Sequence, residues 1–252
     1  MPANFGMPAL RSPKTDADMQ AFILCGGFGT RFQQVSTDIP KSLAPINGVP
    51  FLEILIRSLR AKGVTRFVLG TGHLAEKIEE YFGDGKKLGV EIRYSRETKP
   101  LGTAGAIKLA EPVLEDTFLA LNGDSYVEFD LPGMKKAMAA HDAWMVLALQ
   151  KVSDASRYGT VIVGAGSRVE GFREKAATQG AAFINAGVYL MRRSVLEELL
   201  PDRAISIEKE VIPTLVSRGV YGVPGDGVFI DIGIPEDFAR AQTVLRDVIR
   251  GG

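Results

Sequence analysis

The residues whose types could most clearly take part in chemistry directly follow an apolar run near the N-terminus. The loop Gly26-Gly27-Phe28-Gly29-Thr30-Arg31 comes after the run 21–25, and Lys41 follows shortly afterwards. Glycine lets backbone N–H groups approach phosphate oxygens without a Cβ in the way, and Arg31 and Lys41 supply positive charge. These residue types in this order suit the binding of a nucleoside triphosphate.

Two better-known phosphate loops do not fit this segment. A dinucleotide-binding fingerprint needs a third glycine where Phe32 stands, and Pro40 interrupts the helix that should follow it. A Walker A loop needs Gly-Lys-Ser/Thr, which the sequence lacks. A plain glycine-rich turn with a surface arginine is the alternative that the loop leaves open.

Two aspartates, Asp124 and Asp231, are candidate metal ligands. Asp124 comes just after the apolar run 117–121, and Asp231 lies inside the apolar run 228–232. The carboxyl end of a parallel strand is where ligands of open α/β sheets bind, and Mg²⁺ takes one or two carboxylates together with water and phosphate oxygens. Considered singly, Asp124 could instead be a turn residue and Asp231 a capping or ion-paired carboxylate.

The elements that must position these residues alternate between strand and helix in the first half. Four short apolar runs read as buried strands, and the segments 51–59, 74–82 and 131–138 have apolar residues at helical spacing. This alternation predicts right-handed βαβ units around a mostly parallel, Rossmann-like sheet flanked by helices. The four runs are 21–25, 66–70, 90–94 and 117–121.

The pattern of the second half is typical of antiparallel strands. The runs 161–163 and 169–172 flank a glycine-rich turn at 164–167, and a longer run covers 183–191. Pro235 opens a final helix whose apolar positions continue to Val248. We therefore expect one α/β domain over residues 19–252, with a nucleotide-binding half at 19–150 and a sugar-binding half at 151–252, after a flexible arm at 1–18.

Composition excludes several functional classes. The 252 residues carry 30 Lys+Arg against 30 Asp+Glu, so a basic nucleic-acid binder or a polybasic membrane binder is excluded. Cys25 is the only cysteine and there are two histidines, which rules out an intramolecular disulfide framework and a cysteine-based zinc site. Without an apolar run long enough to span a membrane or the pattern of a signal peptide, the sequence predicts a cytoplasmic protein.

The glycine loop and Pro40-Lys41 together resemble the signature of the sugar-1-phosphate nucleotidylyltransferases. Further segments match that family in order along residues 20–245, nearly the whole chain. The ordered set is far more specific than any one of its members. These segments are Pro100-Leu101-Gly102-Thr103-Ala104-Gly105, Asn122-Gly123-Asp124, Phe172-Arg173-Glu174-Lys175, Asn185-Ala186-Gly187 and Phe229-Ile230-Asp231-Ile232-Gly233.

The resemblance implies a role for each matching residue. Arg31 and Lys41 would act on the triphosphate and the departing pyrophosphate, and Asp124 and Asp231 would hold Mg²⁺ between the nucleotide and the sugar phosphate. Glu97 stands at the position that reads the base, where a carboxylate favours guanine weakly. The remaining nucleotide-binding positions are Leu24, Gly26, Gly27, Gly29, Thr30, Gly102 and Thr103, and the sugar-phosphate positions are Asn122, Asp124, Gly159, Glu174, Lys175 and Asn185.

Within the family, the segments Ala44-Pro45-Ile46-Asn47-Gly48 and Phe229–Phe238 look most like the D-glycero-D-manno-heptose 1-phosphate guanylyltransferases. The expected substrates are therefore GTP, or another nucleoside triphosphate, and a sugar 1-phosphate. Mannose-1-phosphate guanylyltransferases and uridylyltransferases of glucose 1-phosphate or N-acetylmuramate 1-phosphate share the mechanism and are the alternatives. A regulatory subunit that binds a nucleotide sugar without reacting is the alternative from another class. The family's members often assemble, so the resemblance also allows a homo-oligomer.

Overall fold

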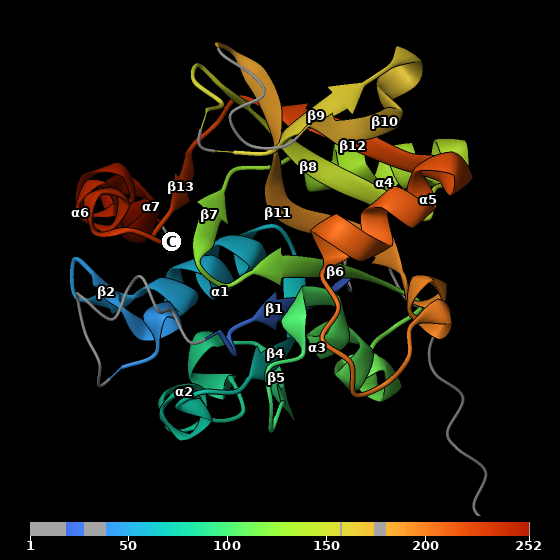
Figure 1. Cartoon of the computed structure of the whole chain (residues 1–252). Coiled ribbons are helices and arrows are strands. Elements are labelled where there is room, and N and C mark those ends of the chain that lie inside the picture. The colour runs from blue at the N-terminus through green and yellow to red at the C-terminus, as the bar shows by residue number, and fades with distance from the viewer. Residues whose placement is uncertain (1–18, 28–38, 157, 174–179, 252) are drawn as a thin grey trace, which may run out of the picture.

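The apolar runs of both halves join one central sheet, which has nine strands in the computed structural model over its described residues, 19–27, 39–156, 158–173 and 180–251 (Figure 1). Two further pairs of short strands lie outside that sheet. In chain order the strands are β1 Met19–Leu24, β2 Pro45–Ile46, β3 Val49–Pro50, β4 Val64–Thr71, β5 Glu91–Arg96, β6 Thr117–Asn122, β7 Ser125–Val127, β8 Met145–Val152, β9 Thr160–Val163, β10 Val169–Arg173, β11 Ala182–Arg192, β12 Val220–Gly225 and β13 Phe229–Asp231.

The sheet is mostly parallel. Strands β5, β4, β1 and β6 lie side by side in that order and are all parallel. The long strand β11 pairs antiparallel with β6 on one side and with β8 on the other, and β12 extends the sheet parallel to β8. Strands β9 and β10 form an antiparallel hairpin beside the first part of β11. This mixed sheet, parallel in the first half with antiparallel additions in the second, confirms the predicted fold class.

Helices cover both faces of the sheet because successive side chains of a strand point to opposite faces. Ala21 and Ile23 of β1 pack in a core with α1, α2, α4 and α6, whereas Phe22 packs in a second core with α3 and α5. The helices are α1 Phe51–Ala61, α2 Ala75–Phe82, α3 Gly102–Ala110, α4 Leu131–His141, α5 Ile212–Gly219, α6 Pro235–Val244 and α7 Arg246–Gly251, and a π-helix, Ile207–Val211, directly precedes α5.

Two details differ from the sequence-based expectation. The final helix does not run unbroken from Pro235 to Val248, because it ends at Val244 and α7 begins at Arg246. The helices α3 and α5 were not predicted; the small residues of α3 give little contrast between an apolar and a polar face. The expected arm at 1–18 lies outside the described residues. Among the described helices, none has the length and apolar character that crossing a membrane requires.

Candidate active site

A cavity of about 440 Å³ opens at the carboxyl ends of β1 and β6. β1 has β4 on one side and β6 on the other, so this is the switch point at which open α/β sheets bind ligands. Nine predicted site residues line it, drawn from five separate segments. They are Leu24, Gly26, Gly27, Lys41, Glu97, Gly102, Thr103, Asn122 and Asp124.

Close backbone contacts shape the floor of the cavity. The chain leaving β6 is held against β1 by a hydrogen bond of 3.0 Å from the Gly123 N–H to the Leu24 carbonyl. A Cβ on Gly123 would lie 2.3 Å from that carbonyl oxygen, so the contact requires glycine. Cys25 is buried beside it, and burial followed by the charge of Asp124 raises the pKa of its thiol. Burial therefore disfavours the thiolate, which is the nucleophilic form of cysteine.

The two predicted metal ligands meet, although they are far apart in the sequence. β13 pairs antiparallel with β7 so that Asp231 lies opposite Ser125, and the Ile232 N–H donates to the Asp124 carbonyl at 2.9 Å. Lys41 lies between the two carboxylates, with its Nζ 2.7 Å from Asp124 Oδ2 and 3.8 Å from Asp231 Oδ1. The side chain of Lys41 is 13% exposed, against 43% for Asp124 and 39% for Asp231, so the carboxylates remain accessible.

The electrostatics of this pair suit a bound cation. Burial, and next the negative charge of Asp124, raise the pKa of Asp231, while Lys41 and the Gly233 N–H act in the opposite direction. A divalent cation would offset that repulsion better than the single charge of Lys41. The described residues contain no group of three or more His, Cys, Asp or Glu arranged to hold a metal. Two carboxylates fit Mg²⁺, which completes its shell with water and phosphate oxygens.

Glu97 lies against the glycine loop, at the end of β5. A Cβ on Gly26 would come 2.7 Å from Glu97 Oε1, so glycine leaves room for the carboxylate at the cavity wall. Its Oε2 accepts a hydrogen bond of 3.1 Å from the Leu101 N–H. Burial raises the pKa of Glu97, and the bond from Leu101 partly offsets this. The carboxylate can accept further hydrogen bonds from a base bound in the cavity.

The predicted sugar-phosphate residues are only partly described. Asn185 lies in β11 at a break in its register with β8, and its side chain contacts the Gly187 N–H and the Tyr189 hydroxyl. Gly187 has φ +75° and packs on Asn122, where a Cβ would lie 2.5 Å from Nδ2. Asn185 itself is not among the described residues that line the cavity. Gly159 lies at the start of β9 beside Arg173, outside the cavity lining.

Five predicted site residues lie outside the described residues. They are Gly29, Thr30, Arg31, Glu174 and Lys175. Arg173, the last described residue before 174, ends β10 and pairs with Thr160 of β9. The roles of Glu174 and Lys175 remain predictions from the resemblance.

Sequence reasoning missed several residues of the site. Ser42, Gly70, Pro100, Ala106 and Gly233 also line the cavity. Pro100 and Gly233 belong to two of the segments that match the family, but the sequence analysis assigned no function to either residue. Ser42 follows Lys41 in a 3₁₀ turn, and Gly70 and Ala106 lie on β4 and α3. No short motif marks these three positions.

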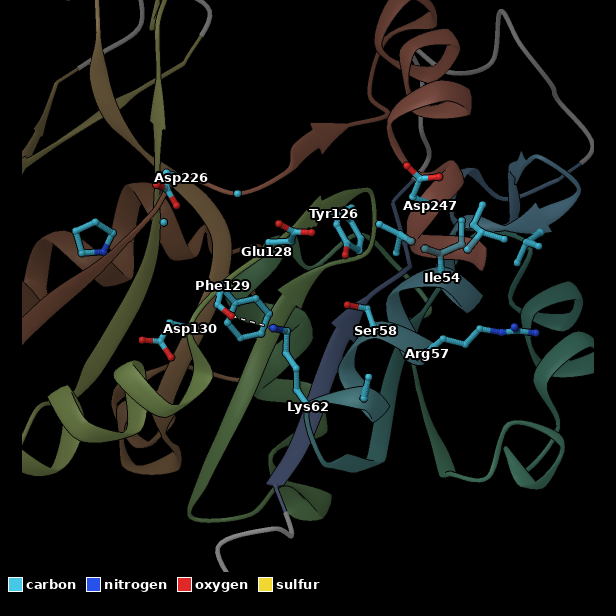
Figure 2. Close-up of a pocket in the computed structure, with 17 residues that line it drawn as sticks. Ile54, Arg57, Ser58, Lys62, Tyr126, Glu128, Phe129, Asp130, Asp226 and Asp247 are labelled. Carbon is cyan, nitrogen blue, oxygen red and sulfur yellow. Dashed lines mark hydrogen bonds between the residues drawn. The ribbon is translucent and has the colours of Figure 1, made fainter. Parts of the chain in front are cut away.

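A larger cavity of about 740 Å³ lies elsewhere, between α1, the loop after β7 and α7 (Figure 2). Figure 2 shows Lys62 reaching the Phe129 carbonyl, to which its Nζ donates at 3.0 Å. Of the described residues that line this cavity, none belongs to the glycine loop or to the Lys41 and aspartate cluster. Size alone therefore does not identify the site, and nine of the residues predicted from the sequence line the smaller cavity.

The chain is similar to several known proteins. A D-glycero-alpha-D-manno-heptose 1-phosphate guanylyltransferase of Campylobacter jejuni is 38% identical, over 87% of this chain and 97% of that protein. A mannose-1-phosphate guanylyltransferase of Mycobacterium tuberculosis is 35% identical, over 92% of this chain and 65% of that protein. The crystal structure of HddC from Yersinia pseudotuberculosis complexed with GMP-PN matches with a TM-score of 0.79 and 32% identity, covering 89% of this chain and 98% of that one.

The family match itself covers nearly all of the chain. Residues 20–248 match the Nucleotidyl transferase family, whose members generally use a divalent metal. That span includes the glycine loop, Lys41 and both aspartates. The chain is therefore a member of the nucleotidyl transferase family and an enzyme of that class.

Proposed function

We propose that the protein transfers a guanylyl group from GTP to D-glycero-α-D-manno-heptose 1-phosphate, giving the GDP-sugar and pyrophosphate. The observation that carries the proposal is the Asp124–Lys41–Asp231 cluster at the edge of the switch-point cavity. The similarity to a heptose 1-phosphate guanylyltransferase over nearly the full length of both chains supports this choice of substrates. Mannose 1-phosphate is the second candidate sugar phosphate, supported by the relative of 35% identity.

The reaction needs two negatively charged groups to meet. An oxygen of the sugar phosphate attacks the α-phosphorus, and a new P–O bond forms as the bond to the bridging oxygen of the β-phosphate breaks. Pyrophosphate leaves with the electron pair of that bond. Positioning and neutralisation of charge supply most of the catalysis of such a step, and no covalent nucleophile is required.

The described residues can divide this work between them. Gly26 and Gly27 offer backbone that phosphate oxygens can approach, and Lys41 brings positive charge to the cavity. Asp124 and Asp231 would hold Mg²⁺, which when bound screens the phosphate charges and orients their oxygens. Arg31 acts with Lys41 on the triphosphate in this proposal, as the family resemblance implies.

Glu97 is proposed as the residue that selects guanine. Its carboxylate has accepting capacity beyond the bond from Leu101, and guanine presents a ring N–H and an exocyclic amine on one edge. A carboxylate accepts both donors, whereas adenine presents an acceptor at the corresponding ring nitrogen. Asn185 and Gly159, with Glu174 and Lys175, are proposed to bind the sugar phosphate.

Release of pyrophosphate tests the proposal. With Mg²⁺ present, GTP, ATP, CTP, UTP and dTTP are crossed against the 1-phosphates of the heptose, mannose and glucose. We expect release with GTP and the heptose phosphate, and we expect E97Q to lose most of its preference for GTP over ATP. Release with another pair would overturn the proposed substrates, and no release with any pair would favour a protein that binds nucleotide sugars without reacting.

A further inference from the structure

A hydrogen-bond network links the proposed nucleotide-binding helix to the proposed sugar-binding strand. Its centre is Glu208 of the π-helix, which stands outside every motif of the sequence analysis. Glu208 Oε2 accepts from Thr103 Oγ1 at 3.1 Å and from Ser206 Oγ at 2.8 Å. Its Oε1 accepts from the Tyr189 hydroxyl at 3.1 Å. That hydroxyl in turn accepts from Asn185 Nδ2 at 2.9 Å.

The segment around Glu208 is fixed to α3 by its backbone as well. The Ile207 N–H donates to Thr103 Oγ1 at 2.7 Å, and the Ile205 carbonyl accepts from the Ala104 N–H at 2.9 Å. Gly102 permits this contact, because a Cβ there would lie 2.6 Å from the Ile205 oxygen. The start of α3 therefore cannot move without moving the carboxylate of Glu208.

Tyr189 transmits the position of Glu208 to the sugar side. Its side chain is fully buried, so its hydroxyl has no water to replace a lost partner. Asn185 in turn is fixed by two bonds, its Nδ2 donating to Tyr189 and its Oδ1 accepting from the Gly187 N–H at 3.1 Å. The network is thus a continuous path from Thr103 to Asn185. π-helical turns inside helices often occur at functional sites, which agrees with this placement.

We propose that Glu208 is a positioning residue that couples the two substrate sites, holding Thr103 with one carboxylate oxygen and, through Tyr189, orienting Asn185 with the other. The inference rests on the proposed function, because that function makes Thr103 and Asn185 substrate-binding residues. Glu208 touches neither substrate in this scheme. Its effect on the sugar phosphate passes through the Tyr189 hydroxyl.

Replacement of Glu208 by glutamine separates the two sides of the network. Glutamine keeps one accepting oxygen, and Thr103 and Ser206 are two donors that need it, so its NH₂ group faces Tyr189. The Tyr189 hydroxyl then loses its acceptor, and Asn185 loses a fixed partner. We expect E208Q to raise the KM for the sugar phosphate about tenfold, the effect of one lost buried hydrogen bond, while the KM for GTP stays within about threefold.

A double-mutant cycle tests the path. Y189F removes the hydroxyl that connects Glu208 to Asn185, so we expect it to raise the KM for the sugar phosphate by a similar factor and E208Q/Y189F to be no worse than either single variant. The matched control is E210Q on the same π-helix, where the carboxylate accepts a hydrogen bond of 2.8 Å from the Ser206 backbone N–H and glutamine can still accept it. Independent, multiplying effects of E208Q and Y189F, or an equal effect of E210Q, would overturn the proposal.

A second readout does not depend on activity. The side-chain amide signal of Asn185 can be assigned in ¹⁵N-labelled protein by its loss in N185D. We expect it to shift in E208Q and Y189F and to stay in place in E210Q. If the wild type releases no pyrophosphate in the substrate panel, the proposed function fails, yet this signal still decides the coupling. An Asn185 signal that E208Q leaves unchanged refutes it, and if E208Q does not fold, Y189F carries the test.

Discussion

Replacement of Asp231 by asparagine should abolish most of the activity while leaving the fold intact. Asparagine preserves the bond that Asp231 Oδ1 accepts from the Gly233 N–H at 2.7 Å, because its amide oxygen can take the same place. It removes the pair with Lys41, whose Nζ lies 3.8 Å from Oδ1. A partly exposed pair of this kind contributes about 0.2–1 kcal/mol.

D231N also removes the repulsion between Asp231 and Asp124, which offsets the loss of the ion pair with Lys41. Burial and the charge of Asp124 raise the pKa of Asp231 above its unfolded value, so the folded state binds the proton more tightly at this site. Stability at this site is therefore greatest below the unfolded pKa and falls as the pH rises through the folded pKa. At neutral pH the charge of Asp231 opposes folding, and asparagine removes it. We expect the free energy of unfolding of D231N to lie within about 1 kcal/mol of the wild type, a change in Tm of at most about 4 °C.

The activity of D231N, unlike its stability, should fall strongly. One of the two carboxylates that fit a cation is lost, and removal of a single preorganised electrostatic group lowers rates about 10²- to 10³-fold. We therefore expect kcat/KM of D231N to fall at least about 100-fold, or about 2.7 kcal/mol of transition-state stabilisation. Pyrophosphate release over a series of Mg²⁺ concentrations and a thermal melt provide the two measurements.

The control is D226N, which makes the same change at an exposed residue just after β12. Asp226 lines the larger cavity and not the smaller one, so D226N should keep wild-type activity. Retention of more than a tenth of the wild-type kcat/KM in D231N at every Mg²⁺ concentration would refute the role of Asp231. A fall in Tm well beyond 4 °C would mean that the lost activity reports unfolding instead.

The remaining predictions concern the glycines and the carboxylate around the same cavity. G123A should lower the free energy of unfolding by about 1–3 kcal/mol, because its Cβ would lie 2.3 Å from the Leu24 carbonyl oxygen. A Cβ on Gly27 would meet no atom of the described residues within 4 Å, so G27A should melt like the wild type but bind GTP more weakly. Calorimetric GTP titrations and thermal melts of both variants check this, and equal melting temperatures would contradict it. As the pH is lowered, the KM for GTP should begin to rise at a higher pH than it would if Glu97 had an ordinary pKa. Burial raises the pKa of Glu97, and only its charged form accepts both guanine donors. E97Q should lack the rise in KM that protonation of Glu97 causes. Identical pH profiles of the KM for GTP in wild type and E97Q would therefore count against Glu97 as the residue that selects guanine.

The sequence predicts most of the parallel sheet because its strands are buried on both faces and are therefore continuous apolar runs. Ala21, Phe22 and Ile23 illustrate this, since neighbouring side chains pack in opposite cores and all are apolar. The loop residues that line the cavity were identified through the family resemblance, because the loop alone is also compatible with a plain glycine-rich turn. Helix α3 was missed, since Gly102 at its start and its run of small residues resemble a loop.

Long-range pairings are the part that local patterns do not contain. Asp231 reaches Asp124 through a ladder of three residues on each strand, which is too short to leave a periodic signal. A glutamate in the charged stretch Glu208-Lys209-Glu210 would be expected to face solvent. Nothing in the neighbouring sequence predicts that Glu208 accepts hydrogen bonds from both halves of the chain. In both cases the pairing partner was unknowable from spacing, and the family resemblance supplied the aspartates but not Glu208.

The arrangement of Lys41 between two carboxylates argues that function, more than stability, accounts for this cluster. Two like charges at one site disfavour each other's ionisation, and a single lysine, 2.7 Å from Asp124 and 3.8 Å from Asp231, neutralises only one of them. A cluster selected for stability would need one carboxylate at most. The second carboxylate becomes favourable only when further positive charge arrives, as it does when a divalent cation accompanies a nucleoside triphosphate. The unequal charge of these three described residues therefore agrees with the proposed site for metal-bound phosphates.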